Sequence, residues 1–143
     1  MLTLKARLGA IIGAAIGAVL LAMACVLQAS PAMASATACQ QENGTGPLFT
    51  CDAVNGGGLH INYVQGSVYN MRTGTQTHVH IEITGPRGHI KNCADSSIPS
   101  LGTIYCKWAP NANEPAGNYC VTAWQYIAGR YYNHGHACIG VHA

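Results

Sequence analysis

Histidine and carboxylate side chains recur at alternate positions in two segments of the chain, THVHIEITGP and YNHGHAC. Residues i and i+2 of a β-strand project from the same face, roughly 6.8 Å apart. Two imidazoles at this spacing can bind one metal ion together with a third ligand from elsewhere in the fold. The pattern therefore yields five candidate ligands for zinc or copper: His78, His80, Glu82, His134 and His136.

The same alternation has a simpler interpretation. Val79, Ile81 and Ile83 occupy the positions in between and would face an apolar core, which leaves the histidines facing water without any site. Four imidazoles would meet only if the two segments were neighbouring strands. We therefore expect no cofactor, and zinc or copper is the alternative that applies if the histidine rows converge.

Nucleophilic catalysis has little support in the sequence. The chain contains no G-x-S-x-G elbow, and its cysteines are expected to be oxidised. Its five acidic residues are spread over the whole chain, with nothing to suggest a catalytic pair. The sequence thus favours a protein that is not an enzyme.

The first part of the chain has the features of a secretory signal peptide. Lys5 and Arg7 precede the apolar run LGAIIGAAIGAVLLAMACVL, and an Ala-rich tail offers Ala32 and Ala34 as an A-x-A cleavage motif. A retained membrane anchor is the alternative for an apolar run of this length, but the small-residue tail is typical of a cleavage region. We expect a signal peptide at 1–34 and a single secreted domain at 35–143, free of the membrane and either diffusible or associated with the cell wall.

The secreted part carries no net side-chain charge. Residues 35–143 contain five acidic and five basic side chains, because the excess of +2 comes from the first residues of the chain. Nucleic-acid binding needs a basic patch or stripe. We therefore expect no nucleic-acid partner.

Six cysteines in the secreted part predict three disulfides, because an even number is typical of small exported domains. Reflecting the last two strand-like segments about Gly129 places Cys120 opposite Cys138. Cys39 and Cys51 bracket the turn ENGTG, and Cys93 and Cys106 remain. The expected pairs are Cys39–Cys51, Cys93–Cys106 and Cys120–Cys138.

Alternation with period two dominates residues 35–143, and Gly and Pro interrupt it at strand-sized intervals. This predicts an all-β fold, namely a small two-sheet β-sandwich stapled by disulfides. The last hairpin would have a three-residue loop, Ala128 to Arg130. Its register would then place Trp124 opposite His134, Thr122 opposite His136 and Tyr126 opposite Tyr132.

The segment EPAGNYCVTAW loosely resembles the immunoglobulin pattern, in which a turn precedes Tyr and Cys on a late strand. Tyr119 is adjacent to Cys120 here, whereas the immunoglobulin tyrosine stands two residues before its cysteine. With its Ala/Gly-rich leader and THVHIEITGP, the chain resembles small cysteine-paired exported proteins of actinobacteria, most of them without assigned activity. The resemblance implies a bacterial exported protein with a β fold.

Aromatic side chains suggest a recognition surface. Tyrosines surround the tip of the last hairpin, and aromatic rings with one polar edge suit protein partners and sugar faces alike. We expect extracellular binding or a cell-surface role, with a protein or glycan partner. The alternative is a protease inhibitor that uses the loop 93–106, tethered by its own disulfide. The candidate binding residues are Trp124, Tyr126, Arg130, Tyr131 and Tyr132.

Overall fold

The computed structural model describes residues 35–42 and 46–143, so the predicted signal peptide lies outside the described residues. No helix that could cross a membrane occurs in these two ranges. The regular structure of the described residues consists of ten β-strands. They are β1 (Ala36–Gln41), β2 (Leu48–Gly57), β3 (His60–Asn70), β4 (Gln76–Gly85), β5 (Gly88–Asn92), β6 (Ser96–Ile98), β7 (Thr103–Trp108), β8 (Ala112–Asn113), β9 (Gly117–Ile127) and β10 (Arg130–Val141).

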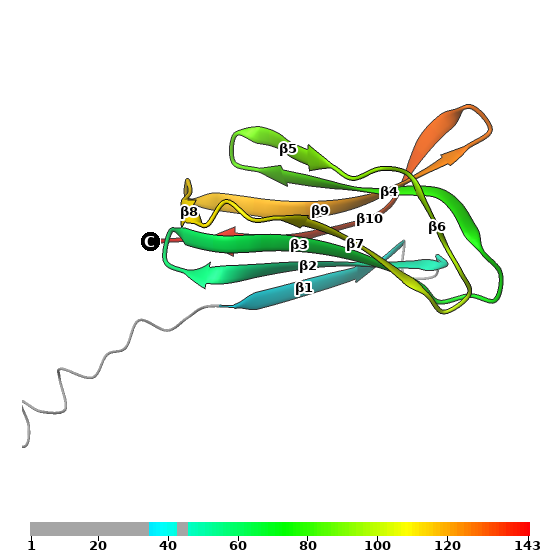
Figure 1. Ribbon diagram of the computed structural model, residues 1–143, viewed down its shortest axis with the longest axis horizontal. Coiled ribbons are helices and arrows are strands. Elements are labelled where there is room, and N and C mark those ends of the chain that lie inside the picture. Colours follow the sequence, from blue (N-terminus) through cyan, green and yellow to red (C-terminus); the bar gives the residue numbers. More distant parts are fainter. Residues whose placement is uncertain (1–34, 43–45) are drawn as a thin grey trace, which may run out of the picture. The chain divides into compact units, whose positions relative to one another are not determined.

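The strands form two sheets in which every pairing is antiparallel (Figure 1). The first sheet has the order β1-β2-β3-β7, with β8 also pairing with β3. The second has the order β10-β9-β4-β5, with β6 also pairing with β4. The chain changes sheet between β3 and β4, between β6 and β7, and between β8 and β9. This two-sheet arrangement confirms the predicted all-β sandwich.

Side-chain alternation explains which face of each sheet is buried. Val79, Ile81 and Ile83 on β4 are almost completely buried, and Val64 and Val68 on β3 face them across the interior. Successive residues of a strand point to opposite faces. His80 and Glu82 are therefore placed on the outer face of the second sheet, as the sequence predicted.

Gly66 on β3 allows the two sheets to approach closely. A Cβ atom at this position would lie 2.7 Å from Ile81 Cγ2 and 2.7 Å from Val121 Cγ1. Real carbon atoms do not approach so closely, so any larger residue would push β4 and β9 away from β3.

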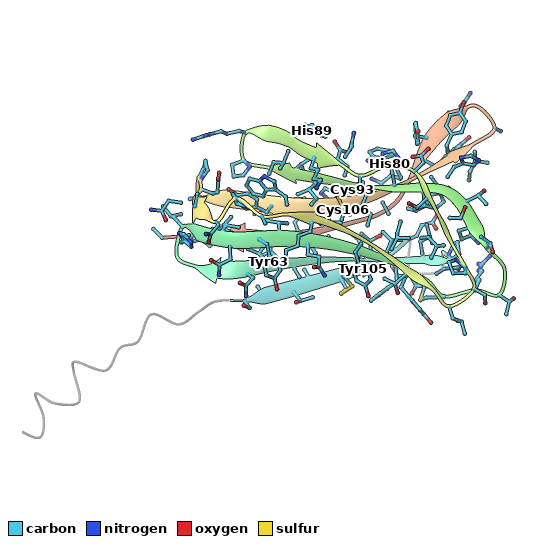
Figure 2. The ribbon with its side chains drawn as sticks, in the orientation of Figure 1. Tyr63, His80, His89, Cys93, Tyr105 and Cys106 are labelled. Atoms are coloured by element: carbon cyan, nitrogen blue, oxygen red, sulfur yellow. A yellow bond between two sulfur atoms is a disulfide. The ribbon has the colours of Figure 1, made fainter. Side chains whose placement is uncertain are left out.

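The structure contains the three predicted disulfides. Cys39–Cys51 and Cys120–Cys138 each join residues directly opposite one another on neighbouring strands, with Cα–Cα distances of 4.0 and 4.1 Å. Cys93–Cys106 differs because it joins the end of β5 in the second sheet to β7 in the first (Figure 2). Of the three disulfides in the described part of the chain, this is the one that joins the two sheets.

The β9–β10 hairpin has a tighter turn than the sequence analysis predicted. Arg130 pairs with Ile127, which leaves a two-residue loop of Ala128 (φ 49°) and Gly129 (φ 91°). Positive φ at both positions is the requirement of a type I′ turn, whose twist suits a two-residue hairpin. The predicted pairs near the tip are therefore wrong by one residue: Tyr126 lies opposite Tyr131, and Trp124 lies opposite Asn133.

A bulge on β10 restores the predicted register below the tip. The pairing shifts by one residue between Asn133 and His136, and from there Thr122 lies opposite His136 and Cys120 opposite Cys138. The bulge includes Gly135, whose φ of 149° favours glycine. The disulfide prediction was thus correct although the loop from which it was derived was not.

Tyr119 makes the hydrogen bond that characterises an immunoglobulin tyrosine corner. Its hydroxyl donates to the carbonyl of Pro115, four residues upstream, at 3.0 Å. The ring is buried and stacks on Trp108, with 6.2 Å between ring centroids. The Cys120 disulfide, however, joins two strands of one sheet, so the likeness to the immunoglobulin pattern ends at this corner.

Candidate functional site

Two carboxylates organise the outer face of the second sheet. The first is Asp95, which follows β5. His80 Nδ1 donates to its Oδ1 at 2.9 Å, and the Tyr131 hydroxyl donates to its Oδ2 at 3.3 Å. Desolvation and the nearby Asp95 carboxylate raise the pKa of Tyr131 further above neutral pH, so its hydroxyl remains a donor. The bond from Nδ1 leaves Nε2 of His80 as the ring nitrogen available to a ligand.

The second carboxylate, Glu82, makes a matching pair of contacts. Trp124 Nε1 donates to Oε2 at 2.7 Å, and His89 Nδ1 lies 3.2 Å from Oε1. Each acid therefore bridges one imidazole and one aromatic donor. Both carboxylates act on the protein's own side chains, and they hold the Trp124 and Tyr131 rings in place.

These side chains enclose a shallow groove of about 300 Å³, which we call the aromatic groove. Its lining residues are His80, Glu82, Asn92, Trp124 and Tyr131. Figure 2 shows His80 and His89 on the second sheet, whereas Tyr63 and Tyr105 belong to the first. The groove has a volume at the lower end of the range for ligand pockets, and it combines aromatic rings with a few fixed polar groups.

The hairpin tip extends the aromatic surface beyond the groove. The rings of Tyr126 and Tyr131 lie 5.0 Å apart, and His78 and His80 contact them edge-on at 6.4 and 4.9 Å. Three of the five predicted binding residues, Trp124, Tyr126 and Tyr131, are thus brought together.

The other two predicted binding residues lie apart from this surface. Tyr132 pairs with the buried Gln125 and so points to the opposite side of the hairpin, and Arg130 is exposed at the turn. The tight turn causes this separation, because it exchanges the sides on which Tyr131 and Tyr132 were predicted to lie.

The five predicted metal ligands do not converge. Within residues 35–42 and 46–143, no three of them have ligand atoms within 4.8 Å of one another. His78 adopts a φ of 54° where the pairing of β4 is irregular, and it lies against Tyr126. His80 and Glu82 are each occupied by partners of their own.

The interpretation of His134 and His136 as a second histidine row is wrong. The β10 bulge turns them to opposite sides of the sheet. His134 is buried, with Nδ1 2.7 Å from Glu42 Oε2, and His136 is exposed beside Thr122 Oγ1 at 2.8 Å. A strand with an extra residue no longer keeps i and i+2 on one face.

One other trio has metal-ligand geometry, namely Cys120, His136 and Cys138. His136 Nε2 lies 3.1 Å from Cys138 Sγ. Both cysteines belong to one disulfide, however, and zinc or copper binds the free thiolate. In its oxidised form the protein cannot use this group as a metal centre.

The loop between Cys93 and Cys106 is tethered, as predicted, but it is not an extended recognition segment. Residues 96–98 pair with β4, and the buried Asn70 amide donates to the carbonyls of Ile98 and Pro99. The Gly102 N–H donates to Pro99 O, closing a turn whose exposed tip is Leu101 (φ 56°). A protease pairs with an extended strand whose backbone groups are available, so this geometry does not favour an inhibitor.

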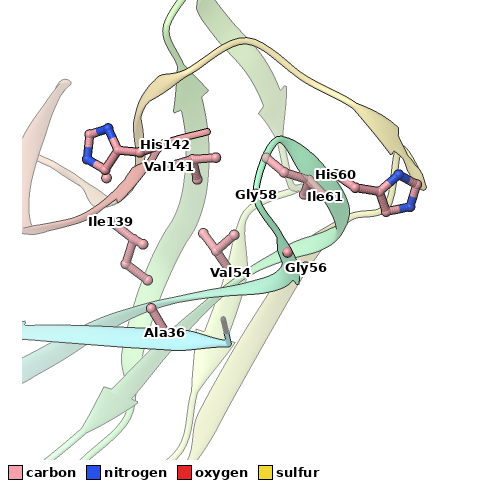
Figure 3. Close-up of a pocket in the computed structure, with 11 residues that line it drawn as sticks. Ala36, Val54, Gly56, Gly58, His60, Ile61, Ile139, Val141 and His142 are labelled. Carbon is pink, nitrogen blue, oxygen red and sulfur yellow. The ribbon is translucent and has the colours of Figure 1, made fainter. Parts of the chain in front are cut away.

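A smaller pocket of about 80 Å³ lies between the sheets where β10 ends near the β2–β3 turn (Figure 3). Ala36, Val54, Ile61, Ile139 and Val141 give it an apolar lining, and the backbone of Gly56 and Gly58 closes one side. It is too small for an organic ligand of ordinary size, so we assign it no ligand.

His89, Asn92 and Asp95 were not among the predicted site residues. Reflecting residues about the Pro86–Arg87 turn would have found His89, which pairs with Thr84, but it would have placed Lys91 opposite Glu82. The irregularity between Ile83 and Thr84 brings Asn92 to that position instead. No pattern in the sequence predicts that Asp95 belongs to this site. It lies in the irregular segment between β5 and β6, and only the tertiary fold brings it to His80.

Comparison with known proteins leaves the chain without an assigned family. No protein-family model, no curated protein and no solved structure matches it.

Proposed function

We propose that the protein is a small exported, non-catalytic binding domain of bacterial origin whose ligand occupies the aromatic groove on the second sheet. The observation that carries this proposal is that two carboxylates each hold one imidazole and one aromatic side chain in place. Asp95 fixes His80 and Tyr131, and Glu82 fixes Trp124 and His89. Side chains held in this way lose little conformational entropy when a ligand arrives.

Binding fits the groove better than catalysis. None of its lining residues is a serine, threonine or cysteine that could act as a nucleophile, and both carboxylates are engaged by neighbouring donors. The three disulfides agree with a protein that works outside the cell.

The test compares the two sheets. The exported protein would be immobilised and exposed to a panel of oligosaccharides, cell-wall polymers and secreted bacterial proteins. Trp124→Ala and Tyr131→Ala should each weaken binding at least about tenfold, as expected for aromatic anchors.

Tyr105 offers a matched control, because it is 65% exposed and lies on β7 of the first sheet. Tyr105→Ala should change binding by less than about twofold. Binding that is lost in Tyr105→Ala and retained in the two groove variants would contradict the proposal. A panel that gives no binding at all would contradict it too.

A further inference from the structure

We infer that the aromatic groove binds an uncharged, hydroxyl-rich ligand, that is, a segment of a neutral glycan. This inference rests on the proposed function and specifies its ligand. It follows from which charged groups at the groove are free to contact a ligand and which are already bonded to neighbouring side chains.

The groove does not suit an anion. Its five lining residues include no lysine or arginine. Lys91, on the neighbouring β5, is directed elsewhere, because its Nζ donates to the carbonyl of Lys107 on β7 at 2.7 Å. Phosphate, sulfate and uronate groups are usually recognised by Arg or Lys, so these ligands lack the partner they need here.

The groove does not suit a cation either. Glu82 and Asp95 are the acids at the site, and both oxygens of each already accept hydrogen bonds or contact an imidazole. A lysine or arginine from a ligand would have to compete with these partners for the same oxygens. If it displaced Trp124 or Tyr131, that aromatic ring would lose its anchor.

The groups of the groove that remain available to a ligand are uncharged. The groove offers the Trp124 and Tyr131 rings, the Nε2 of His80 and the exposed amide of Asn92. Aromatic faces suit the C–H surfaces of sugar rings, and a side-chain amide can donate to one hydroxyl while it accepts from another. A shallow, open groove of this kind accommodates a chain that passes over it.

Fluorescence of Trp124 provides the direct test. The second tryptophan, Trp108, stacks on Tyr119 away from the groove, so Trp108→Phe leaves Trp124 as the reporter with an aromatic ring kept at position 108. This variant would be titrated with neutral oligosaccharides of glucose, mannose, galactose and N-acetylglucosamine. Sulfated, uronate-containing and amino-sugar oligosaccharides would be titrated in parallel.

We expect at least one neutral oligosaccharide to change the Trp124 emission, with a dissociation constant of roughly 10 μM to 1 mM for so open a groove. The affinity should change by less than about twofold between 50 and 500 mM salt, because screening acts on charge interactions. Asn92→Ala should weaken binding about three- to tenfold through the loss of hydrogen bonds.

Two outcomes would overturn the inference and leave the proposed function standing. One is tighter binding of the charged oligosaccharides, with a strong dependence on salt. The other is binding of a protein and of no glycan, lost in Trp124→Ala. Binding of glycans that Trp124→Ala and Tyr131→Ala do not affect would instead overturn both proposals.

Discussion

The two flanks of the sandwich interior bury different kinds of side chain. Between the central parts of β3 and β4 the buried side chains are aliphatic, and Val64, Val68, Ile81 and Ile83 are at most 1% exposed. Between β2 and β10 the interior also contains polar groups. Thr50 and Asp52 on β2 are completely buried, and His134 on β10 is 8% exposed.

Most of these polar groups are poorly satisfied. No partner of normal hydrogen-bond geometry reaches Thr50 Oγ1, either carboxylate oxygen of Asp52, or the ring nitrogens of His134 within the described part of the chain. His134 and Glu42 lie at ion-pair distance without that geometry. Burial raises the pKa of Asp52 to about 7, and the backbone N–H of Ala53 offsets this only in part.

The difference between the flanks shows where stability is gained and where it is lost. Both strands alternate buried and less buried residues, but two inward positions of β2 are the polar Thr50 and Asp52, whereas the buried positions of β4 are aliphatic. Unsatisfied polar atoms in the interior cost free energy. We therefore expect the aliphatic flank to supply stability and the polar flank to make it depend on pH.

The largest expected effect comes from the bulge on β10, which lies in the polar flank. A Cβ at Gly135 would lie 2.9 Å from Thr50 Cβ and closer still to its hydroxyl, on a backbone with φ 149°. Gly135→Ala should lower the free energy of unfolding by about 2–6 kcal/mol, from overpacking and backbone strain together. Urea denaturation would measure it.

Gly129→Ala is the matched control for this variant. Gly129 also has positive φ, at 91°, but a Cβ there would meet nothing within 4 Å. Its cost should be confined to backbone strain, about 1–3 kcal/mol. Equal losses in the two variants would show that the contact between β10 and Thr50 is not tight.

Truncating a side chain in the aliphatic flank should lower the free energy of unfolding by nearly as much. Ile81→Ala removes buried methyl and methylene groups, and we expect a loss of about 2–5 kcal/mol. Ile127→Ala serves as the comparison, because Ile127 is 44% exposed at the hairpin tip, and its loss should stay below about 1 kcal/mol. A small loss for Ile81→Ala would contradict the division of roles between the flanks.

Asp52→Asn should change how stability depends on pH. The folded protein holds the Asp52 proton up to about pH 7, whereas the unfolded chain releases it near pH 4. The free energy of unfolding of the wild type should therefore fall as pH rises from 4 through 7. Asp52→Asn should remove this decline and gain on the order of 4 kcal/mol at most at pH 8.

The check is urea denaturation of both proteins at pH 5 and pH 8. Asp95→Asn is the control, because the Asp95 carboxylate is exposed and hydrogen-bonded. It should leave the decline in place. If the wild type were equally stable at both pH values, the account of Asp52 would be wrong.

The smallest expected effect is an increase in the free energy of unfolding. Thr50→Val keeps the shape of the side chain and removes its unsatisfied hydroxyl, so we expect stabilisation of about 1 kcal/mol. Thr122→Val should act in the opposite direction, because the Thr122 hydroxyl is hydrogen-bonded to His136 at 2.8 Å. Thermal denaturation of the two variants should therefore give shifts of opposite sign.

The sequence was most informative where strands alternate regularly. Val79, Ile81 and Ile83 identified the buried face of β4, and this also placed His80 and Glu82 together on the outer face. The same pattern could not distinguish a metal site from a binding surface. That distinction depends on Asp95 and Trp124, which arrive from distant parts of the chain.

Local irregularities account for the failures. The β9–β10 turn has one residue fewer than predicted, and the β10 bulge has one residue more. The two changes in register cancel before Cys138, so the disulfide was predicted correctly, whereas His134 was placed on the wrong side. A glycine in a strand signals that a bulge can occur but does not say that it does. The polar flank was missed for a similar reason, because Asp52 in an alternating strand gives no sign that it faces inward.

The order of the disulfides has a consequence for proteolytic damage. The three bridges follow one another along the chain without overlapping, and Cys93–Cys106 and Cys120–Cys138 each enclose an exposed turn. A secreted protease that cut once at the β9–β10 tip or at Leu101 would leave both fragments attached through the enclosing bridge. Nicked molecules should therefore run as a single species on a non-reducing gel and separate only after reduction.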